Sequence, residues 1–320
     1  MKTTTFQSGG PDSYTEKTKR VLDDRFEQTI DGIYFSHQPI YGYRSPYSAE
    51  ANIGRHMITR SILNQLNNYN FKNFVDIGGA EGYTANLVKN LFGAEVTSTD
   101  LSDSACERAK EIFGIEAVAC DIHQLPFADA SFDAVLCSET IEHVTDFKKA
   151  VTELLRITKK VLVITVPHES AEQVEANIRD NVPHGHINSF DVDSFNYLLE
   201  KGYTVKSEKT QSPFLVIPRV LSEASQKSGN NPAIGLYNIL RPILRKLFGI
   251  KTAKGLIDID AKLCRITGPY MGISFVIEKD LSAAREQVAR PITANDFVNL
   301  TVPHHHLTYS NRSQPNFSGS

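Results

Sequence analysis

Short apolar runs alternate with amphipathic segments over residues 71–211 of this chain. The first run, Asn73–Ile77, is built from apolar and β-branched residues around one carboxylate, and a glycine-rich turn follows it. A short, nearly continuous apolar run of this kind is typical of a buried parallel strand. Residues 83–92 then carry apolar side chains at helical spacing, and Gly93 is placed to end that helix. A strand, a glycine turn and a helix in this order indicate the start of a doubly wound α/β fold.

The same alternation predicts the remaining elements. Strands are expected at 95–100, 115–119, 131–138, 160–166, 203–211 and 271–278, and helices at 49–66, 102–113, 147–158 and 189–201. Ser102 can cap the N-terminus of the helix at 102–113, and Gly114 can end it. The last strand follows an insertion that spans 212–270.

Gly78, Gly79 and Gly82 form the turn after the first strand, and they let the backbone come close to a ligand. Their spacing differs from the G-x-G-x-x-G fingerprint of dinucleotide-binding proteins. Asp76, in the strand before them, would sit poorly beside a pyrophosphate and well beside an ammonium group. The D-x-G-x-x-x-G pattern resembles the first motif of class I S-adenosylmethionine (SAM)-dependent methyltransferases, many of which have a third glycine where this chain has Ala80.

Carboxylates follow two further strands. Asp100 ends the second strand, where it can accept hydrogen bonds from both ribose hydroxyls of a bound nucleoside. In the methyltransferase family, an aspartate at the position of Asp121 holds the exocyclic amine of adenine, and the next residue flanks the ring. The segments L-P-F (125–127) and S-E-T-I-E-H-V (138–144) strengthen the resemblance, which covers about residues 71–195 and extends to the ubiquinone-pathway O-methyltransferases. The expected cofactor-binding residues are Asp76, Gly78, Gly79, Gly82, Asp100, Leu101, Asp121, Ile122 and Glu139.

The resemblance implies a Rossmann-like methyltransferase fold, which is a doubly wound, mostly parallel α/β sheet of seven strands with an antiparallel last strand. We expect this SAM-binding core at 71–211, with its last strand at 271–280. Residues 1–70 are expected to hold a polar segment, a tyrosine-rich loop and a lead-in helix. A helical insertion occupies 212–270, and a polar tail follows at 281–320.

Four segments lie outside the predicted core, and two of them are open to more than one interpretation. Residues 1 to about 30 are polar and are expected to be loosely ordered. Residues 34–47, rich in tyrosine and containing His37, form either a flap over the substrate or a segment packed across the surface. Residues 234–250 predict a basic amphipathic helix that serves as a lid, as a dimer helix or as a contact with a membrane surface. The short histidine run at 304–306 is expected to be inert.

Composition narrows the class of protein. The 320 residues are 41% hydrophobic and 22% charged, as in an ordinary soluble globular protein. A net charge of −3 gives no reason to expect nucleic-acid binding through a basic surface. The four cysteines lack C-x-x-C spacing, and the N-terminal sequence lacks the apolar core of a signal peptide, so a cytoplasmic protein is expected.

A second group of polar residues lies just past the fourth strand. Glu139, Glu142 and His143 stand as E-x-x-E-H, a spacing that brings them together if the segment is helical. His186 can approach from a neighbouring loop, with His184 as the alternative. Two carboxylates and two imidazoles suit Mg²⁺, Mn²⁺ or Zn²⁺. The arrangement resembles the metal site of ubiquinone-pathway O-methyltransferases and of small-RNA 2′-O-methyltransferases. The same motif also occurs in relatives with no known metal. By that resemblance, His143 would instead serve as a base or pack in the core, and Glu139 would face the cofactor.

These observations predict an enzyme that transfers the methyl group of SAM to a hydroxyl of a small molecule, a lipid or a glycan. The predicted catalytic residues are Glu139, Glu142 and His143, and the same three with His186 are the predicted ligands of Mg²⁺ or Zn²⁺. The alternatives are a metal-assisted RNA 2′-O-methyltransferase and a SAM-binding regulatory protein without turnover. The sequence does not identify the acceptor.

Overall fold

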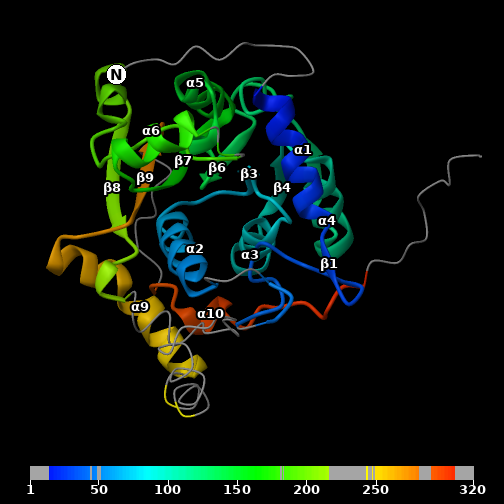
Figure 1. The fold of residues 1–320 in the computed structure, drawn as a ribbon. Helices are drawn as coiled ribbons and strands as arrows, with labels where there is room; N and C mark the ends of the chain where they lie inside the picture. The colour runs from blue at the N-terminus through cyan, green and yellow to red at the C-terminus, as the bar shows by residue number, and fades with distance from the viewer. Residues whose placement is uncertain are drawn as a thin grey trace, which may run out of the picture.

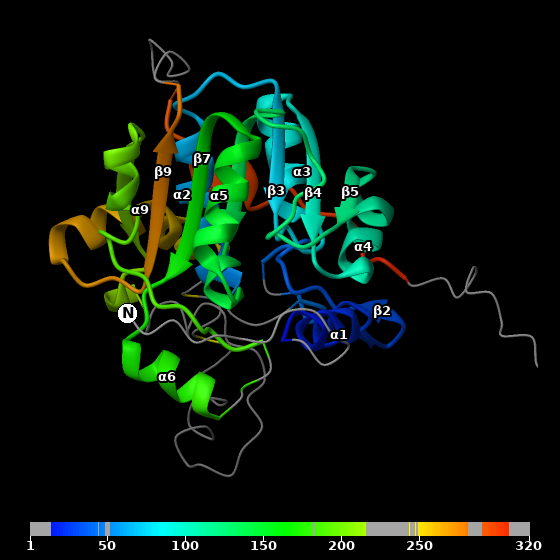
Figure 2. The ribbon, with the colours of Figure 1, turned by 90° about the horizontal axis from the view of Figure 1, so that it is seen from above.

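The computed structural model describes residues 14–43, 45–48, 52–180, 182, 184–215, 243, 247, 249–280 and 290–306. Its main feature is a seven-stranded sheet in the order β5-β4-β3-β6-β7-β9-β8 (Figures 1 and 2). Strand β9 runs antiparallel to both β7 and β8, and the other neighbouring pairs are parallel. The sheet therefore confirms the predicted fold. The strands are β3 (Asn73–Ile77), β4 (Glu95–Asp100), β5 (Glu116–Ala119), β6 (Phe132–Ser138), β7 (Thr158–Pro167), β8 (Thr204–Thr210) and β9 (Gly272–Glu278).

The direction of chain progression reverses at β3, which has β4 on one side and β6 on the other. Ile77, at the end of β3, pairs with Thr99 in β4 and with Cys137 in β6. Gly78, Asp100 and Ser138 therefore meet at one edge of the sheet. In open α/β sheets, ligands bind outside the carboxyl ends of the strands at such a reversal point.

Helices cover both faces of the sheet (Figure 2). α2 (Asn52–Leu66) and α3 (Tyr83–Phe92) pack on one face, and α5 (Phe147–Ile157) packs on the other. Successive residues of β3 point to opposite faces, so Phe74 is buried with α2 and α3 whereas Val75 is buried with α5. This burial on both sides explains why the strand reads as an apolar run instead of an alternating one.

α4 (Asp103–Phe113) begins and ends where the sequence predicts. The Ser102 hydroxyl accepts a hydrogen bond from the Ala105 amide at 3.1 Å, and Gly114 ends the helix with a φ of 59°. The helix predicted at 189–201 is wrong for its first part, because only the 3₁₀ helix η2 (Asn196–Lys201) forms. The Asp191 amide donates to the Ser194 hydroxyl, and the Asp193 carboxylate accepts from the Asn196 amide group. These local bonds compete with a continuous helix.

The N-terminal segment is more ordered than its polar sequence predicts. Residues Tyr14–Phe26 form α1, which packs against α4 through Leu22, Phe26 and Ala105. Figure 2 shows α1 beyond the edge of the sheet where the parallel strands end. The short strands β1 (Thr29–Ile30) and β2 (Ile33–Tyr34) follow it as a hairpin.

The C-terminal part also differs from the prediction of a polar tail. Residues 290–306 return to the core, where Ile292, Phe297 and Val298 are buried. Phe297 ends the short helix α10 (Ala294–Phe297), which contacts α9 (Ile250–Thr267), a helix the sequence analysis does not delimit. Most of 234–250 lies outside the described residues, and the lid, dimer or membrane role predicted for it stays a prediction. The remaining elements are η1 (Ile141–His143), α6 (Ala171–Arg179) and η3 (Pro213–Leu215).

Candidate cofactor and acceptor site

A cavity of about 440 Å³ lies at the carboxyl ends of β3, β4 and β6, in the size range of small-molecule sites. Gly78 and Asp100 line it on the sheet side, and α1 and the segment after β2 line it on the opposite side. The expected cofactor residues among its walls are Gly78, Asp100, Leu101, Asp121, Ile122 and Glu139.

Asp100 is prepared for a hydrogen-bonded ligand. One of its carboxylate oxygens accepts from the Ser102 amide and the other from the Ala80 amide, both at 3.0 Å. These two bonds fix the carboxylate plane and leave further lone pairs facing the cavity, as a ribose diol requires. Burial raises the pKa of Asp100 to about 6, although the backbone hydrogen bonds from Ser102 and Ala80 act to lower it.

Asp121 stands at the other end of the expected nucleoside site. One of its oxygens accepts from the His123 amide at 2.9 Å and lies 2.6 Å from the His123 ring nitrogen Nδ1. Burial acts to raise the pKa of Asp121, but the hydrogen bonds from His123 outweigh it and the pKa is lowered. The second oxygen of this ionised carboxylate can accept from an exocyclic amine, and Ile122 lines the cavity beside it. These contacts fit an adenine ring.

The glycine turn divides into ligand-facing and packing positions. Gly78 lines the cavity with a φ of 74°, and a Cβ there would collide with the Thr140 side chain. Gly79 and Gly82 do not line it. A Cβ on Gly79 would lie 3.0 Å from the Asp76 carboxylate carbon, and one on Gly82 would lie 2.7 Å from Ile115. Their small size therefore serves packing within the turn.

Asp76 is buried beneath the turn and lines a separate small cavity together with Arg55. Burial, followed by the charge of Asp100, raises the pKa of Asp76 to about 7. Ala80 adopts a φ of 48°, which is the left-handed conformation that the third glycine of the family would adopt freely.

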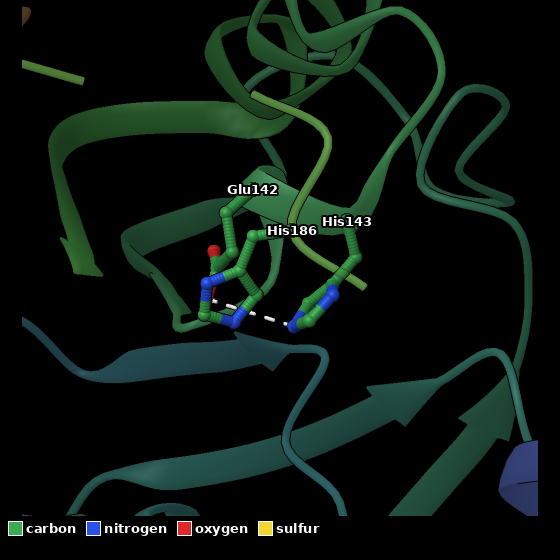
Figure 3. Close-up of side chains that lie close together, drawn as sticks. All are labelled: Glu142, His143 and His186. Carbon is green, nitrogen blue, oxygen red and sulfur yellow. Dashed lines mark ion pairs between the residues drawn. The ribbon is translucent and has the colours of Figure 1, made fainter. Parts of the chain in front are cut away.

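Glu142, His143 and His186 bring one ligand atom each to within 4.8 Å of one another (Figure 3). They come from η1 and from the segment after α6, which lie far apart in the sequence. His143 Nε2 lies 3.7 Å from a Glu142 carboxylate oxygen, and the other Glu142 oxygen is buried without a hydrogen-bond partner in the described structure. His184 stacks on His143 with the ring centroids 3.8 Å apart.

The two imidazoles of this cluster are oriented by bonds on their outer nitrogens. His143 Nδ1 lies 3.2 Å from the Gly185 carbonyl oxygen, and His186 Nδ1 lies 2.8 Å from a Glu169 carboxylate oxygen. Both partners accept, so both Nδ1 atoms carry a hydrogen. The neutral His143 therefore has its lone pair on Nε2, the atom that lies nearest Glu142. Outer bonds of this kind hold the imidazoles of metal sites. Burial lowers the pKa of His143 to about 2, which keeps that imidazole neutral.

Glu139 does not belong to this group of three. It lies before η1 with a φ of 53°, and its carboxylate accepts from the Thr165 hydroxyl at 3.1 Å. The prediction that Glu139 and Glu142 share a helical face is therefore wrong, because the segment is a single 3₁₀ turn. Glu139 still lines the cavity. Its role toward the cofactor stays a prediction.

The structure also adds cavity residues that the sequence analysis missed. Arg25 comes from α1, His37 and Gln38 come from the tyrosine-rich segment, and Arg55 comes from α2. Among the described residues of 34–47, no tyrosine lines the cavity. Tyr34 is instead fully buried, and the segment packs against the core while it presents His37 and Gln38 to the cavity.

Comparison with known proteins identifies the type of domain that contains the sheet. Residues 75–164 match the family model of a methyltransferase domain. This part of the chain is a methyltransferase domain of the class I SAM-dependent type. The chain is 26% identical over 147 residues to the O-methyltransferase resE of Aspergillus sclerotiorum, which covers 43% of this chain and 56% of the relative. It is 34% identical over 89 residues to the ubiquinone/menaquinone biosynthesis C-methyltransferase UbiE of Desulfotalea psychrophila, which covers 27% of this chain and 36% of that relative.

A solved structure shares the methyltransferase fold. The geranyl diphosphate C-methyltransferase of Streptomyces coelicolor A3(2) matches with a TM-score of 0.52 at 15% identity, over 83% of this chain and 98% of that one. The chain thus spans between about a third and just over half of the two curated relatives, and the family assignment rests on the core. Among the described helices of this methyltransferase, none is long and apolar enough to cross a membrane.

Proposed function

We propose that this methyltransferase transfers the methyl group of SAM to a hydroxyl of a small organic acceptor. The observation that carries the proposal is the joining, in one cavity, of a nucleoside site at Asp100 and Asp121 with the cluster of Glu142, His143 and His186. SAM, when bound, supplies an electrophilic methyl group, which the acceptor oxygen takes in a direct displacement that leaves S-adenosylhomocysteine. The hydroxyl proton passes to water.

The residues present fit SAM group by group. Asp100 would accept from the ribose hydroxyls, and Asp121 with Ile122 would hold the adenine. Arg55 lies beside Gly78 and Asp76, and its guanidinium makes no hydrogen bond or ion pair within the described part of the chain. It is thus placed to bind the carboxylate of the methionine moiety in the fork geometry that arginine prefers.

We further propose that Glu142, His143 and His186 hold a divalent cation. Glu142 is 1% exposed, and burial raises its pKa well above the ordinary value. A carboxylate with a buried, unpartnered oxygen needs either a proton or a cation, and two imidazoles beside it can supply ligand nitrogens to a cation. A cation there would lower the pKa of an acceptor hydroxyl. His143 is poorly suited to act alone as a base, because a pKa of about 2 is far from neutral pH.

Incubation of the purified chain with methyl-labelled SAM and a cell extract tests the methyl transfer, and a labelled product is expected. Elemental analysis of the same protein tests the cation, with about one equivalent of a divalent metal expected. Glu142→Gln should lose the metal and the activity while it retains S-adenosylhomocysteine binding by calorimetry. Glu175→Gln, on the exposed side of α6, is the matched control. Full activity in exhaustively chelated protein would rule out the metal role.

A further inference from the structure

Two arginines face the cavity with guanidinium groups that make no direct ion pair with a carboxylate among the described residues, although carboxylates such as Glu81 lie close enough for their charge to act on Arg25. The Arg25 side chain makes one hydrogen bond, from Nε to His37 Nδ1 at 3.0 Å. Neither of its terminal nitrogens donates to any residue that the structure describes, and the same holds for the whole guanidinium of Arg55. Both residues line the cavity. A partly buried guanidinium with free donors is typical of a site that receives an oxyanion.

Arg25 is held in place by a network that leaves its terminal nitrogens free. His37 Nε2 lies 3.1 Å from the Arg25 carbonyl oxygen, so the two ring nitrogens of His37 contact the side chain and the backbone of Arg25. The His37 amide donates at 2.6 Å to Glu81, a fully buried carboxylate that also accepts from the hydroxyls of Tyr34 and Ser36. The Arg25 side chain is therefore already ordered in the absence of an anion, and binding an anion would cost little further conformational entropy.

The two arginines enter the cavity from different elements, Arg25 from α1 and Arg55 from α2. Arg55 also adjoins Asp76 and the glycine turn, where the methionine moiety of SAM is expected, whereas Arg25 does not line that smaller cavity. SAM carries one carboxylate. If Arg55 binds it beside the turn, the Arg25 guanidinium is left for a second anion.

We propose that the acceptor is an acid, and that Arg25 binds its carboxylate or phosphate group while its hydroxyl faces Glu142, His143 and His186. This inference rests on the methyl transfer proposed above and names the class of acceptor. Arg25 is then a specificity-determining residue, because an uncharged analogue of the acceptor would leave its guanidinium desolvated and unpaired.

Chemical modification tests how the two arginines divide their ligands. The full chain is treated with phenylglyoxal, alone, with S-adenosylhomocysteine or with 5′-methylthioadenosine, which lacks the amino-acid carboxylate, and modified residues are located by mass spectrometry. S-adenosylhomocysteine should protect Arg55, 5′-methylthioadenosine should not, and Arg25 should react equally with both. Protection of Arg25 by S-adenosylhomocysteine alone would assign the SAM carboxylate to Arg25 and overturn the proposal.

The charge of the product tests the acceptor directly. The labelled product from the extract should bind an anion exchanger at pH 7 and elute with salt. Loss of that charge on phosphatase treatment identifies a phosphate, and loss on carbodiimide coupling to an amine identifies a carboxylate. A labelled product that flows through uncharged overturns this proposal alone, whereas no labelled product overturns the proposed function and this inference with it.

Variants of Arg25 complete the test. Arg25→Gln should lower kcat/KM for the purified acceptor by at least about 30-fold, as for other truncated charge pairs, with S-adenosylhomocysteine binding changed less than about twofold. Arg25→Lys should recover part of the loss, because a lysine keeps the charge without the fork. Arg20→Gln, on the exposed side of α1, is the control. An Arg25→Gln enzyme with unchanged kcat/KM would refute the assignment.

Discussion

Replacement of Asp100 by asparagine tests the cofactor site most sharply, because the shape is kept and only one oxygen and the charge are changed. Both carboxylate oxygens of Asp100 accept a backbone hydrogen bond, from Ala80 and from Ser102. In the Asp100→Asn protein, the new amide group must face one of these two N–H groups. One backbone donor then loses its acceptor, and one ribose hydroxyl loses an ionised partner.

The size of the effect follows from these bonds. A hydrogen bond to a charged group contributes about 1.5–3 kcal/mol, and a buried donor left unpaired costs about 1–3 kcal/mol. In the variant, the new amide group faces a backbone N–H group in the free protein and in the complex alike. This unfavourable contact therefore largely cancels in the binding free energy, and mainly the lost bond to the ribose lowers the affinity. We expect Asp100→Asn to weaken S-adenosylhomocysteine binding by about 1.5–3 kcal/mol, or roughly 10- to 150-fold in Kd. Isothermal titration calorimetry at pH 7.5 measures this, with Asp103→Asn, an exposed site at the start of α4, as control.

The pH dependence gives a second readout of the same residue. The pKa of Asp100 is raised to about 6 in the folded protein, and the ligand prefers the ionised form. Binding should therefore weaken as the pH falls through about 6, by about tenfold per pH unit below it. The Asp100→Asn protein should show a flatter profile. A change of less than about twofold at pH 7.5, or the same pH profile in both proteins, would refute the assignment of Asp100 to the ribose.

Three further predictions concern stability and order. In urea titrations, Gly93→Ala should lower the free energy of unfolding by about 1–2 kcal/mol, and Gly82→Ala should lower it by more. Both glycines have a positive φ, but only at Gly82 does a Cβ meet another side chain, at 2.7 Å, whereas Gly93 faces open space. Glu81→Gln should speed amide exchange over residues 34–38, measured by mass spectrometry, because this carboxylate binds three donors there; unchanged exchange would show that the segment is held otherwise. The pKa of His184 is lowered to about 4, mainly by burial, so the unfolded chain binds more protons between pH 6.5 and 4. Relative to wild type, His184→Gln should gain stability as the pH falls through that range, by at most about 1.4 kcal/mol per unit, and a parallel decline would contradict the shift.

The cofactor half of the site is predictable from the sequence because its signals are local. A glycine turn, a capping serine and a carboxylate at the end of a strand each act within a few residues of one another. Parallel strands then bring Asp100 and Gly78 to one edge without any further information. Asp76 is the exception, because the sequence places it near the ligand whereas the backbone turns its side chain beneath the glycines, into a separate cavity.

The acceptor half is less predictable because its residues come from segments that acquire structure only by packing on the core. The polar sequence of α1 shows three buried positions, Thr18, Leu22 and Phe26, one helical turn apart, which is a weak signal without α4 beneath it. The packing of residues 290–306 against the core is similarly difficult to predict, because Ile292 and Phe297 are isolated apolar residues in a polar stretch. A pattern of hydrophobic residues does not show which distant surface such residues will cover.

The division of the site has a consequence for how the acceptor is chosen. The matched methyltransferase domain spans residues 75–164 and contains the cofactor carboxylates, together with Glu142 and His143. Arg25, His37, Arg55 and His186 lie outside it, and they supply the free guanidinium groups and the third member of the histidine–carboxylate cluster. The positions proposed to bind SAM are thus set by the sheet, whereas the charge proposed to face the acceptor is set by segments outside the matched domain that pack against the sheet and its helices. Relatives that keep the core and differ in these flanks are therefore expected to bind the same cofactor and to methylate acceptors of different charge.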